Sequence, residues 1–207
     1  MTKRIEEILK RIPTCETLLD VGCDHGIVSY EALKRGIAEH VICSDVSAPS
    51  LQKAKNLIGE NGTYYVADGI PCSQSDFDFL VIAGMGGQEI MKILCGKLPC
   101  NALFQPMKNI DEFRSFLVSS GYKIESDEII EDGKFYNIIV TSEGSDCLSE
   151  DERLFGRTNL KNRSENFIKY LTFEEQKAKR IIKHVSDKRK AELTSYLERL
   201  EKIKNDD

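Results

Sequence analysis

The sequence has little of what a metal site or a disulfide framework requires. Its 207 residues include three histidines, and its seven cysteines are scattered without a C-x-x-C pair. An odd number of cysteines cannot form a complete set of disulfides, and Cys43 lies in an apolar run, where cysteine behaves as a small hydrophobic residue. We therefore expect no metal, and we expect a reducing compartment, the cytoplasm.

Long apolar runs are also absent. No segment approaches the ~18–20 apolar residues of a membrane-spanning helix, and residues 1–4 lead into an amphipathic segment rather than a signal-peptide core. Hydrophobic residues make up 41% of the chain and charged residues 30%, a balance typical of globular proteins. We expect no membrane association. At roughly 150 residues per domain, the length predicts one domain with an appendage or two small domains.

The net charge of −5 is unevenly distributed along the chain. Residues 1–152 carry a formal net charge of −11, whereas residues 153–204 carry +8. Two interpretations of this basic tail are open: it is a solvated helix face, or it is a docking surface for an acidic partner.

Short apolar runs alternate with helical segments through the first part of the chain. We expect strands over residues 17–21, 40–45, 63–67, 77–83 and 102–105, and helices over residues 27–35, 48–58, 87–94 and 110–120. Such alternation predicts a parallel sheet with right-handed crossover connections.

The pattern then changes from alternation to a hairpin. Residues 122–131 and 134–141 are two extended runs joined by Asp132-Gly133, a strong hairpin signal. An NAD-type Rossmann domain would more naturally continue with another parallel strand. Five parallel strands followed by a hairpin predict an α/β protein with the class I (Rossmann-like), S-adenosylmethionine-dependent methyltransferase fold.

The tail is helical in pattern and lacks glycine and proline from about residue 163 to residue 204. Its last apolar residues step by three, four and three, which predicts a coiled-coil-like extension, and we favour two antiparallel helices over one bent helix. Thr172 and Glu175 have the spacing of a capping box that would restart a helix. We expect a methyltransferase domain over residues 1–145 and a linker with the basic helical extension over residues 146–207, with the linker itself near residues 142–162.

Acidic residues and glycines follow four successive predicted strands. Residues 20–26 read Asp-Val-Gly-Cys-Asp-His-Gly, Asp45 and Asp68 follow the next two strands, and residues 83–87 read Ala-Gly-Met-Gly-Gly. In doubly wound sheets, ligands bind outside the carboxyl ends of the strands. Asp45 is placed to accept hydrogen bonds from a ribose diol, and Asp68 to accept one from an adenine amine. Together these groups predict a nucleoside-binding edge.

Charge selects among nucleoside cofactors. A pyrophosphate cofactor favours G-x-G-x-x-G, but here Gly22 is followed by Cys23 and Asp24, which places a negative charge where a diphosphate would lie. S-adenosylmethionine carries an ammonium and a sulfonium, and carboxylates such as Asp20 and Asp24 attract both. The pattern favours S-adenosylmethionine over NAD.

Several short sequence motifs, spread over about residues 2–142, resemble those of the TrmK family of bacterial tRNA (adenine-22-N1)-methyltransferases. They are Lys-Arg-Ile at residues 3–5, Asp-Val-Gly-Cys-Asp-His at 20–25, Ile-Ala-Gly-Met-Gly-Gly at 82–87, Leu-Phe-Gln-Pro at 103–106 and Glu-Asp-Gly-Lys-Phe-Tyr at 131–136. The resemblance implies S-adenosylmethionine as cofactor, tRNA as substrate, adenine N1 in the D-arm as target, and a C-terminal coiled coil. Ile27 and Met107 depart from the family pattern, which usually has tyrosine and asparagine there.

The resemblance also implies site residues. Asp24 would lie where cofactor and target base meet, with Arg4 reaching the same place, while His25 either bonds the base or fixes the loop, the role we favour. The catalytic candidates are therefore Asp24, Arg4 and His25. The cofactor-binding candidates are Asp20, Gly22, Asp24, Asp45, Val46, Asp68, Gly69, Ala83, Gly84, Met85 and Gly86.

The implied reaction needs no general base, because adenine N1 carries a lone pair and no proton. Catalysis would rest on positioning, with a carboxylate such as Asp24 stabilising positive charge on the ring. N1 takes part in base pairing, so the target adenine must leave its stack or be unpaired.

The basic tail then has an RNA-binding interpretation, because an acidic body would repel RNA. Within 14 residues only Asp187 opposes the RNA-binding candidates, which are Lys177, Lys179, Arg180, Lys183, Lys188, Arg189 and Lys190. A solvated face or an oligomer contact stays open, and we expect a monomer. Three other functions stay open: a methyltransferase for another RNA position or a small molecule, a catalytically silent RNA-binding protein, and an NAD-type dehydrogenase.

Overall fold

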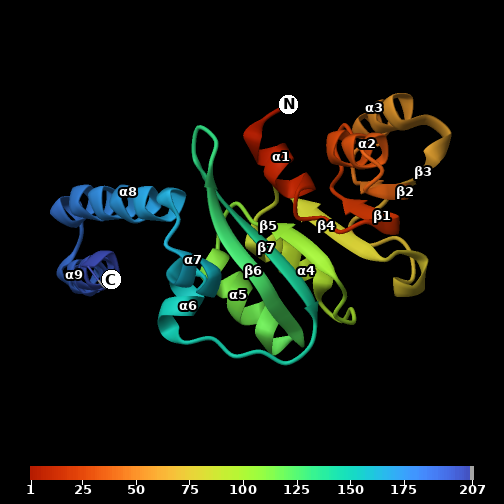
Figure 1. Cartoon of the computed structure of the whole chain (residues 1–207). Coiled ribbons are helices and arrows are strands. Elements are labelled where there is room, and N and C mark those ends of the chain that lie inside the picture. The colour runs from red at the N-terminus through yellow and green to blue at the C-terminus, as the bar shows by residue number, and fades with distance from the viewer. Residues whose placement is uncertain (206–207) are drawn as a thin grey trace.

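Seven strands form one sheet in the computed structural model, which describes residues 1–205. Their order is β3-β2-β1-β4-β5-β7-β6 (Figure 1). The strands are β1 (Cys15–Val21), β2 (Ala38–Asp45), β3 (Gly62–Val66), β4 (Phe79–Ala83), β5 (Ala102–Gln105), β6 (Tyr122–Glu131) and β7 (Phe135–Glu143). The strands β1 to β5 are parallel, and β7 runs antiparallel to both β5 and β6. The expected parallel sheet with a terminal antiparallel hairpin is confirmed.

Helices cover both faces of this sheet. One face is packed by α1 (Lys3–Leu9), α2 (Ile27–Lys34) and α3 (Ala48–Ile58). The other is packed by α4 (Gly87–Leu94) and α5 (Ile110–Ser119). Neighbouring strand residues point to opposite faces, so Leu18 joins the first core and Leu19 the second. This two-sided burial explains why the central strands read as continuous apolar runs.

The segment that we expected to be a linker is mostly helical. It contains α6 (Glu150–Phe155) and α7 (Arg157–Asn162), and Ser149 begins α6 as a capping box with Glu152. Side chains of Thr158 and Asn159 accept hydrogen bonds from the main-chain N–H groups of Asp127 and Ile129, at 3.0 and 2.9 Å. The segment therefore covers the outer edge of β6, which would otherwise leave main-chain groups unpaired.

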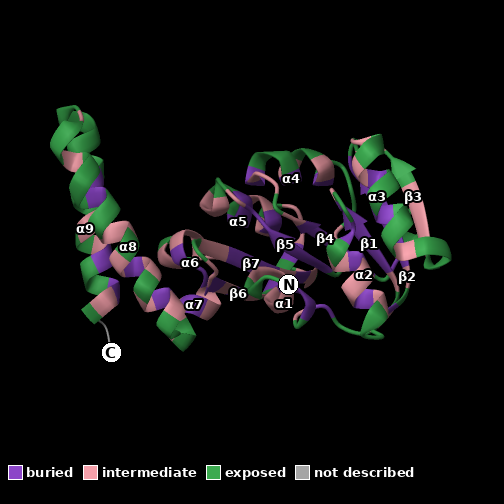
Figure 2. Ribbon diagram, turned by 90° about the horizontal axis from the view of Figure 1, so that it is seen from above, coloured by how far each residue is buried: buried purple, intermediate pink, exposed green. Residues whose placement is uncertain are grey.

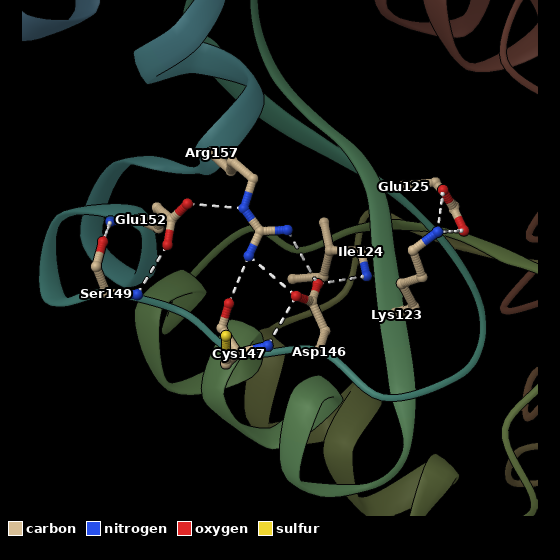
Figure 3. A network of polar contacts seen from close by, with 8 residues as sticks. All are labelled: Lys123, Ile124, Glu125, Asp146, Cys147, Ser149, Glu152 and Arg157. Atoms are coloured by element: carbon tan, nitrogen blue, oxygen red, sulfur yellow. Dashed lines mark hydrogen bonds and ion pairs between the residues drawn. The ribbon is translucent and has the colours of Figure 1, made fainter.

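An ion-pair network holds the chain that leads into these helices (Figure 3). Arg157 pairs with Asp146 at 3.0 Å and with Glu152 at 2.7 Å, and it also donates to the Cys147 carbonyl. Asp146 in turn accepts a hydrogen bond from the main-chain N–H of Ile124 at 3.1 Å. These contacts fasten the connection after β7 to the start of β6.

The last two long helices form an antiparallel hairpin, which we call the arm. It consists of α8 (Glu165–Ile181), the short turn η3 (Ile182–His184) and α9 (Asp187–Asn205). The hairpin that we favoured from the sequence is confirmed. The capping box at Thr172 was wrong: α8 is continuous there, and the Thr172 hydroxyl donates to the Ile168 carbonyl at 3.1 Å.

The arm is attached to the rest of the chain through a third, smaller apolar core. Its members come from β6, α6 and both arm helices and are Ile129, Phe155, Phe167, Leu171, Leu200 and Ile203. Figure 2 shows the arm at the end of the molecule opposite β3, with much of its outward surface exposed. We call the part of the chain from α1 to β7 the body; α6 and α7 connect it to the arm.

Candidate functional site

A cavity of about 460 Å³ lies at the carboxyl ends of the central strands. The sheet changes its winding direction between β1 and β4, and β1, β2 and the loop after β4 all contribute to the cavity wall. Such a switch point is where α/β sheets bind ligands. Six of the predicted cofactor-binding residues line it: Gly22, Asp45, Val46, Asp68, Gly69 and Met85.

Asp45 organises the loops around this cavity. Its Oδ2 accepts a hydrogen bond from the Asp24 main-chain N–H at 2.9 Å, and its Oδ1 accepts one from the Ser47 N–H at 2.8 Å. A carboxylate has about four acceptor positions, so Asp45 can still accept from a ligand hydroxyl. The carboxylate is thereby held in one orientation toward the cavity by the two loops that flank it.

Gly22 has a left-handed backbone angle and packs against the end of the Met85 side chain. Its φ is +71°, and a Cβ added there would lie 1.9 Å from the Met85 methyl carbon. Any side chain at residue 22 would therefore push Met85 out of its place in the cavity wall. Met85 therefore lies directly against the backbone of this loop.

Five predicted cofactor-binding residues do not line the cavity. They are Asp20, Asp24, Ala83, Gly84 and Gly86. Asp20 is buried beneath the loop, where its Oδ2 accepts a hydrogen bond from the Ser29 hydroxyl at 2.7 Å. Burial raises the pKa of the Asp20 carboxyl to about 6, and the negative charge of Asp45 adds to the rise.

Asp24 and His25, in the loop after β1, have exposed side chains. The Asp24 side chain is 71% exposed, and His25 Nε2 lies 3.5 Å from its Oδ1. The same imidazole nitrogen lies 3.1 Å from Lys53 Nζ on α3. His25 therefore links the loop to α3, and the Asp24 carboxylate is accessible to solvent.

Arg4 lies at the carboxyl ends of β4 and β5. Its Nη1 donates to Gln105 Oε1 at 3.2 Å, and its guanidinium carbon lies 5.4 Å from the centre of the Tyr136 ring. A Cβ added at Gly84 would lie 3.6 Å from Arg4 Nη1, so Gly84 adjoins this side chain rather than the cavity.

Sequence reasoning missed several residues at both places. The cavity wall also includes Val21, Ala67, Glu89, Lys92 and Ile93. Gln105 and Tyr136 hold Arg4, and both belong to motifs that carried the family resemblance. Only those family motifs could have pointed to Gln105 and Tyr136, because both residues lie more than 100 positions from Arg4 in the sequence.

The basic residues of the arm are partly neutralised. Lys177 pairs with Glu174 at 3.0 Å, Lys179 with Glu175, and Arg189 with Glu192 at 2.7 Å. These glutamates lie just outside the 14-residue span, in which Asp187 is the one acidic residue, and they pair with it as helix neighbours three or four residues away. Within residues 1–205 the candidates without an ion pair are Arg180, Lys183, Lys188 and Lys190.

Two features are absent from residues 1–205. No group of three or more His, Cys, Asp or Glu side chains is arranged to hold a metal ion. In the same part of the chain, no helix combines the length and apolar character that crossing a membrane requires.

Comparison with known proteins gives concordant matches. The family described as "Methyltransferase domain" matches residues 1–139. The tRNA (adenine(22)-N(1))-methyltransferase of Bacillus subtilis is 25% identical over 227 aligned positions, which cover 99% of this chain and 95% of that protein.

Solved structures resemble the whole chain. The structure of Streptococcus pneumoniae Sp1610 in complex with S-adenosyl-L-methionine has a TM-score of 0.89 and 27% identity, over 99% of this chain and 100% of that one. The structure of the B. subtilis m1A22 tRNA methyltransferase TrmK has a TM-score of 0.86 and 25% identity, over 99% of each chain.

Proposed function

We propose that this chain, which belongs to the methyltransferase-domain family and within it to the TrmK family, methylates N1 of adenine 22 in the D-arm of tRNA. The methyl donor is S-adenosylmethionine. The observation that carries the proposal is the acidic cavity at the switch point of the sheet, in a chain whose full length resembles m1A22 methyltransferases.

The residues of the cavity fit S-adenosylmethionine better than a dinucleotide. Its wall carries three carboxylates, from Asp45, Asp68 and Glu89, against one cation, Lys92. This balance attracts the ammonium and sulfonium of S-adenosylmethionine and repels a diphosphate. The carboxylates of the cavity wall, like Asp24, therefore disfavour an NAD-type dehydrogenase.

The cavity residues divide the work of binding. Asp45 would hold the ribose hydroxyls, Asp68 would accept from the adenine amine, and Met85 and Ile93 offer apolar surface to the flat ring. When bound, S-adenosylmethionine supplies a methyl group activated for transfer by its positively charged sulfur. Asp20 lies beneath the loop and would not contact the cofactor. Through its hydrogen bond with Ser29 it would instead hold the loop in position.

The residues at the mouth of the site act on the target base. Adenine N1 is already a nucleophile, so the protein has to align it with the methyl group, and alignment alone can supply ~7–11 kcal/mol. Arg4, oriented by Gln105 and Tyr136, would position the base. The exposed carboxylate of Asp24 would stabilise the positive charge that the ring gains on methylation.

The remaining expectations stay proposals. We propose that the arm binds tRNA through its basic residues, that the chain acts as a monomer in the cytoplasm, and that the domain boundary lies near residue 145. The state of the cysteines suits a reducing compartment, since Cys15, Cys23, Cys43, Cys72, Cys95, Cys100 and Cys147 are free thiols.

The test is methyl transfer to tRNA that carries an unmodified D-arm. We expect 1-methyladenosine at position 22, located by mass mapping of nuclease fragments, and no product on a control tRNA with guanine at that position. Methylation elsewhere would assign another RNA position. Tight binding of tRNA and cofactor without any product would instead identify a catalytically silent RNA-binding protein, the alternative suggested by Ile27 and Met107.

A further inference from the structure

A second large cavity separates the body from the arm. It has a volume of about 600 Å³ and is open along one side. Its floor includes Met107, after β5, and one wall is the turn between β6 and β7, with Lys134 and Phe135. The opposite wall is α8, with Tyr170, Phe173 and Lys177. We call this cavity the arm groove; the β6–β7 turn and α8, which supply these walls, can be located in Figure 1.

The arm groove has an aromatic wall in which one ring, that of Phe173, is partly exposed and has Lys177 Nζ 6.0 Å from its centre. The Phe135 ring lies 5.6 Å from the ring of Tyr170 and 5.5 Å from that of Phe173, measured between centroids. Phe173 is nevertheless 43% exposed. An aromatic cluster with one accessible ring is the arrangement on which unpaired nucleobases stack.

Positive charge exceeds negative charge around these rings. The wall carries three lysines, and its two carboxylates already have partners: Glu131 pairs with Lys169 at 3.5 Å and Glu174 with Lys177 at 3.0 Å. Within residues 1–205, neither Lys108 nor Lys134 makes an ion pair. Both lysines are exposed and available to a phosphate.

The arm groove is continuous with the residues that hold Arg4. The amide nitrogen of Gln105 lies 3.1 Å from the Met107 sulfur, and Gln105 is also the side chain that bonds Arg4. The β6–β7 turn contributes Asp132, whose Oδ2 accepts from the Arg4 main-chain N–H at 2.9 Å. In the other direction, α8 leads from Lys177 toward Arg180. A strand of RNA that reaches from the target site to the basic arm would pass along this groove.

We propose that the arm groove binds an unstacked nucleotide that neighbours the target adenine, with its base on Phe135 and Phe173 and its phosphate at Lys134 and Lys108. The inference rests on the proposed function, because it takes tRNA as the substrate. Exposing N1 removes the target adenine from its stack, so the neighbouring base loses a stacking partner. The aromatic wall replaces that partner and offsets part of the cost of opening the RNA. The lysine surplus favours this polyanion over a peptide or a second copy of the acidic body.

The first test compares two exposed aromatic residues. Phe173→Ala should weaken binding of unmodified tRNA roughly tenfold, measured by fluorescence anisotropy at fixed salt, because one stacking contact is lost. The matched control is Tyr65→Ala on β3, at the far end of the sheet, where the ring is 40% exposed and lies outside both cavities. The control should bind tRNA as the wild type does, and both variants should keep the wild-type affinity for S-adenosylhomocysteine.

A second variant separates stacking from folding of the arm. Phe173→Leu keeps the apolar side chain and removes the ring, so it should retain the wild-type melting temperature and still lose tRNA affinity. Lys134→Gln should lower the slope of log affinity against log salt by about one, because one phosphate contact is lost.

Abasic RNA identifies the occupant. An abasic nucleotide on one side of adenine 22 should weaken binding to the wild type, and on that RNA Phe173→Ala should cause no further loss. Wild-type tRNA affinity in Phe173→Ala and Phe173→Leu would overturn the proposal. So would a wild-type dimer that Phe173→Ala dissociates, since the occupant would then be a second copy. A wild type that binds tRNA without methylating it would refute the proposed function, and the affinity comparison would still decide the role of the groove.

Discussion

The body and the arm are held together in different ways. In the body, β4 and its neighbours are covered on both faces, and residues such as Leu80 and Val81 are fully buried. In the arm, each helix buries a narrow stripe, and much of the rest is charged and paired along the helix, as in Lys169 with Glu165 and Lys179 with Glu175. Exposed pairs of this kind contribute little to stability, because solvent screens them.

This difference matches the two tasks proposed for the chain. A small cofactor needs atoms fixed to fractions of an ångström, which a densely packed sheet provides. A long polyanion needs a charged surface, and charges on solvated helices provide that with little demand on packing. Substitutions around the cofactor cavity of the body should therefore change stability or cofactor binding, whereas substitutions on the exposed charged face of the arm should change RNA binding alone.

The largest effect is expected where the two regions join. Arg114 and Asp127 form an ion pair whose side chains are each 1% exposed, and Arg114 also donates to the Leu154 carbonyl of α6 at 2.9 Å. Arg114→Ala leaves the Asp127 carboxylate buried without its cation, which typically costs about 3–5 kcal/mol of unfolding free energy. Urea denaturation measures it. A loss below about 1 kcal/mol, the range of exposed pairs, would show that this contact is no stronger than those of the arm.

A pH-dependent effect is expected from Asp20 in the body. Its pKa is about 6 in the folded protein against an ordinary value of 3.8, so between these pH values the folded state holds more protons than the unfolded state. Stability from this group therefore falls as pH rises through that window and is constant above it. Asp20→Asn, which can still accept from Ser29, should be more stable than the wild type at pH 7 by on the order of 2–3 kcal/mol.

The advantage of Asp20→Asn should shrink as pH falls through the window and disappear below about pH 3, where the wild-type carboxyl is protonated in both states. Chemical denaturation at the two pH values measures the difference. An equal gain at both would mean that the amide improves packing and that ionisation of Asp20 does not matter.

The cofactor site can be tested at Gly22 with a control matched for backbone angle. Gly22 and Gly36 have φ values of +71° and +65°, but a Cβ meets Met85 at the first and nothing within 4 Å at the second. Both alanine variants should lose about 1–2 kcal/mol of stability from left-handed strain. Only Gly22→Ala should also weaken S-adenosylhomocysteine binding, by roughly tenfold or about 1.4 kcal/mol, in calorimetry. Equal affinities for the two variants would place the cofactor away from Met85.

Local sequence patterns were sufficient for much of the fold and for part of the site. The strands, the Asp132-Gly133 hairpin and the arm follow from periodicity and turn chemistry, and Asp45 and Asp68 line the cavity because parallel strands end at one edge. Asp20 lies two residues after Leu18, so both side chains are on the same face of β1, the face that α2 covers. We did not use this alternation to place Asp20 from the sequence.

Other features depend on contacts that no local pattern records. The helices α6 and α7 form where the sequence has few apolar residues, because Phe155 is buried in the arm core and Asn159 bonds the edge of β6. The cluster of Arg4, Gln105 and Tyr136 joins three distant segments. Partners of the basic arm residues were missed for a simpler reason, since a count over a short window omits glutamates one helical turn away.

The smallest effect on stability, and one confined to RNA binding, is expected in the arm. Arg180 and Lys183 make no ion pair within residues 1–205, so replacing both by glutamine should change unfolding free energy by less than about 0.5 kcal/mol. The same double variant should lower the slope of log tRNA affinity against log salt by about two, because two phosphate contacts are lost.

Lys179→Gln is the comparison: Glu175 already neutralises Lys179, so its effect on tRNA affinity should be smaller than that of either neighbour. Salt dependence identical to the wild type in the double variant would leave the basic face a solvated surface, and tRNA would have to be held by the body and the arm groove.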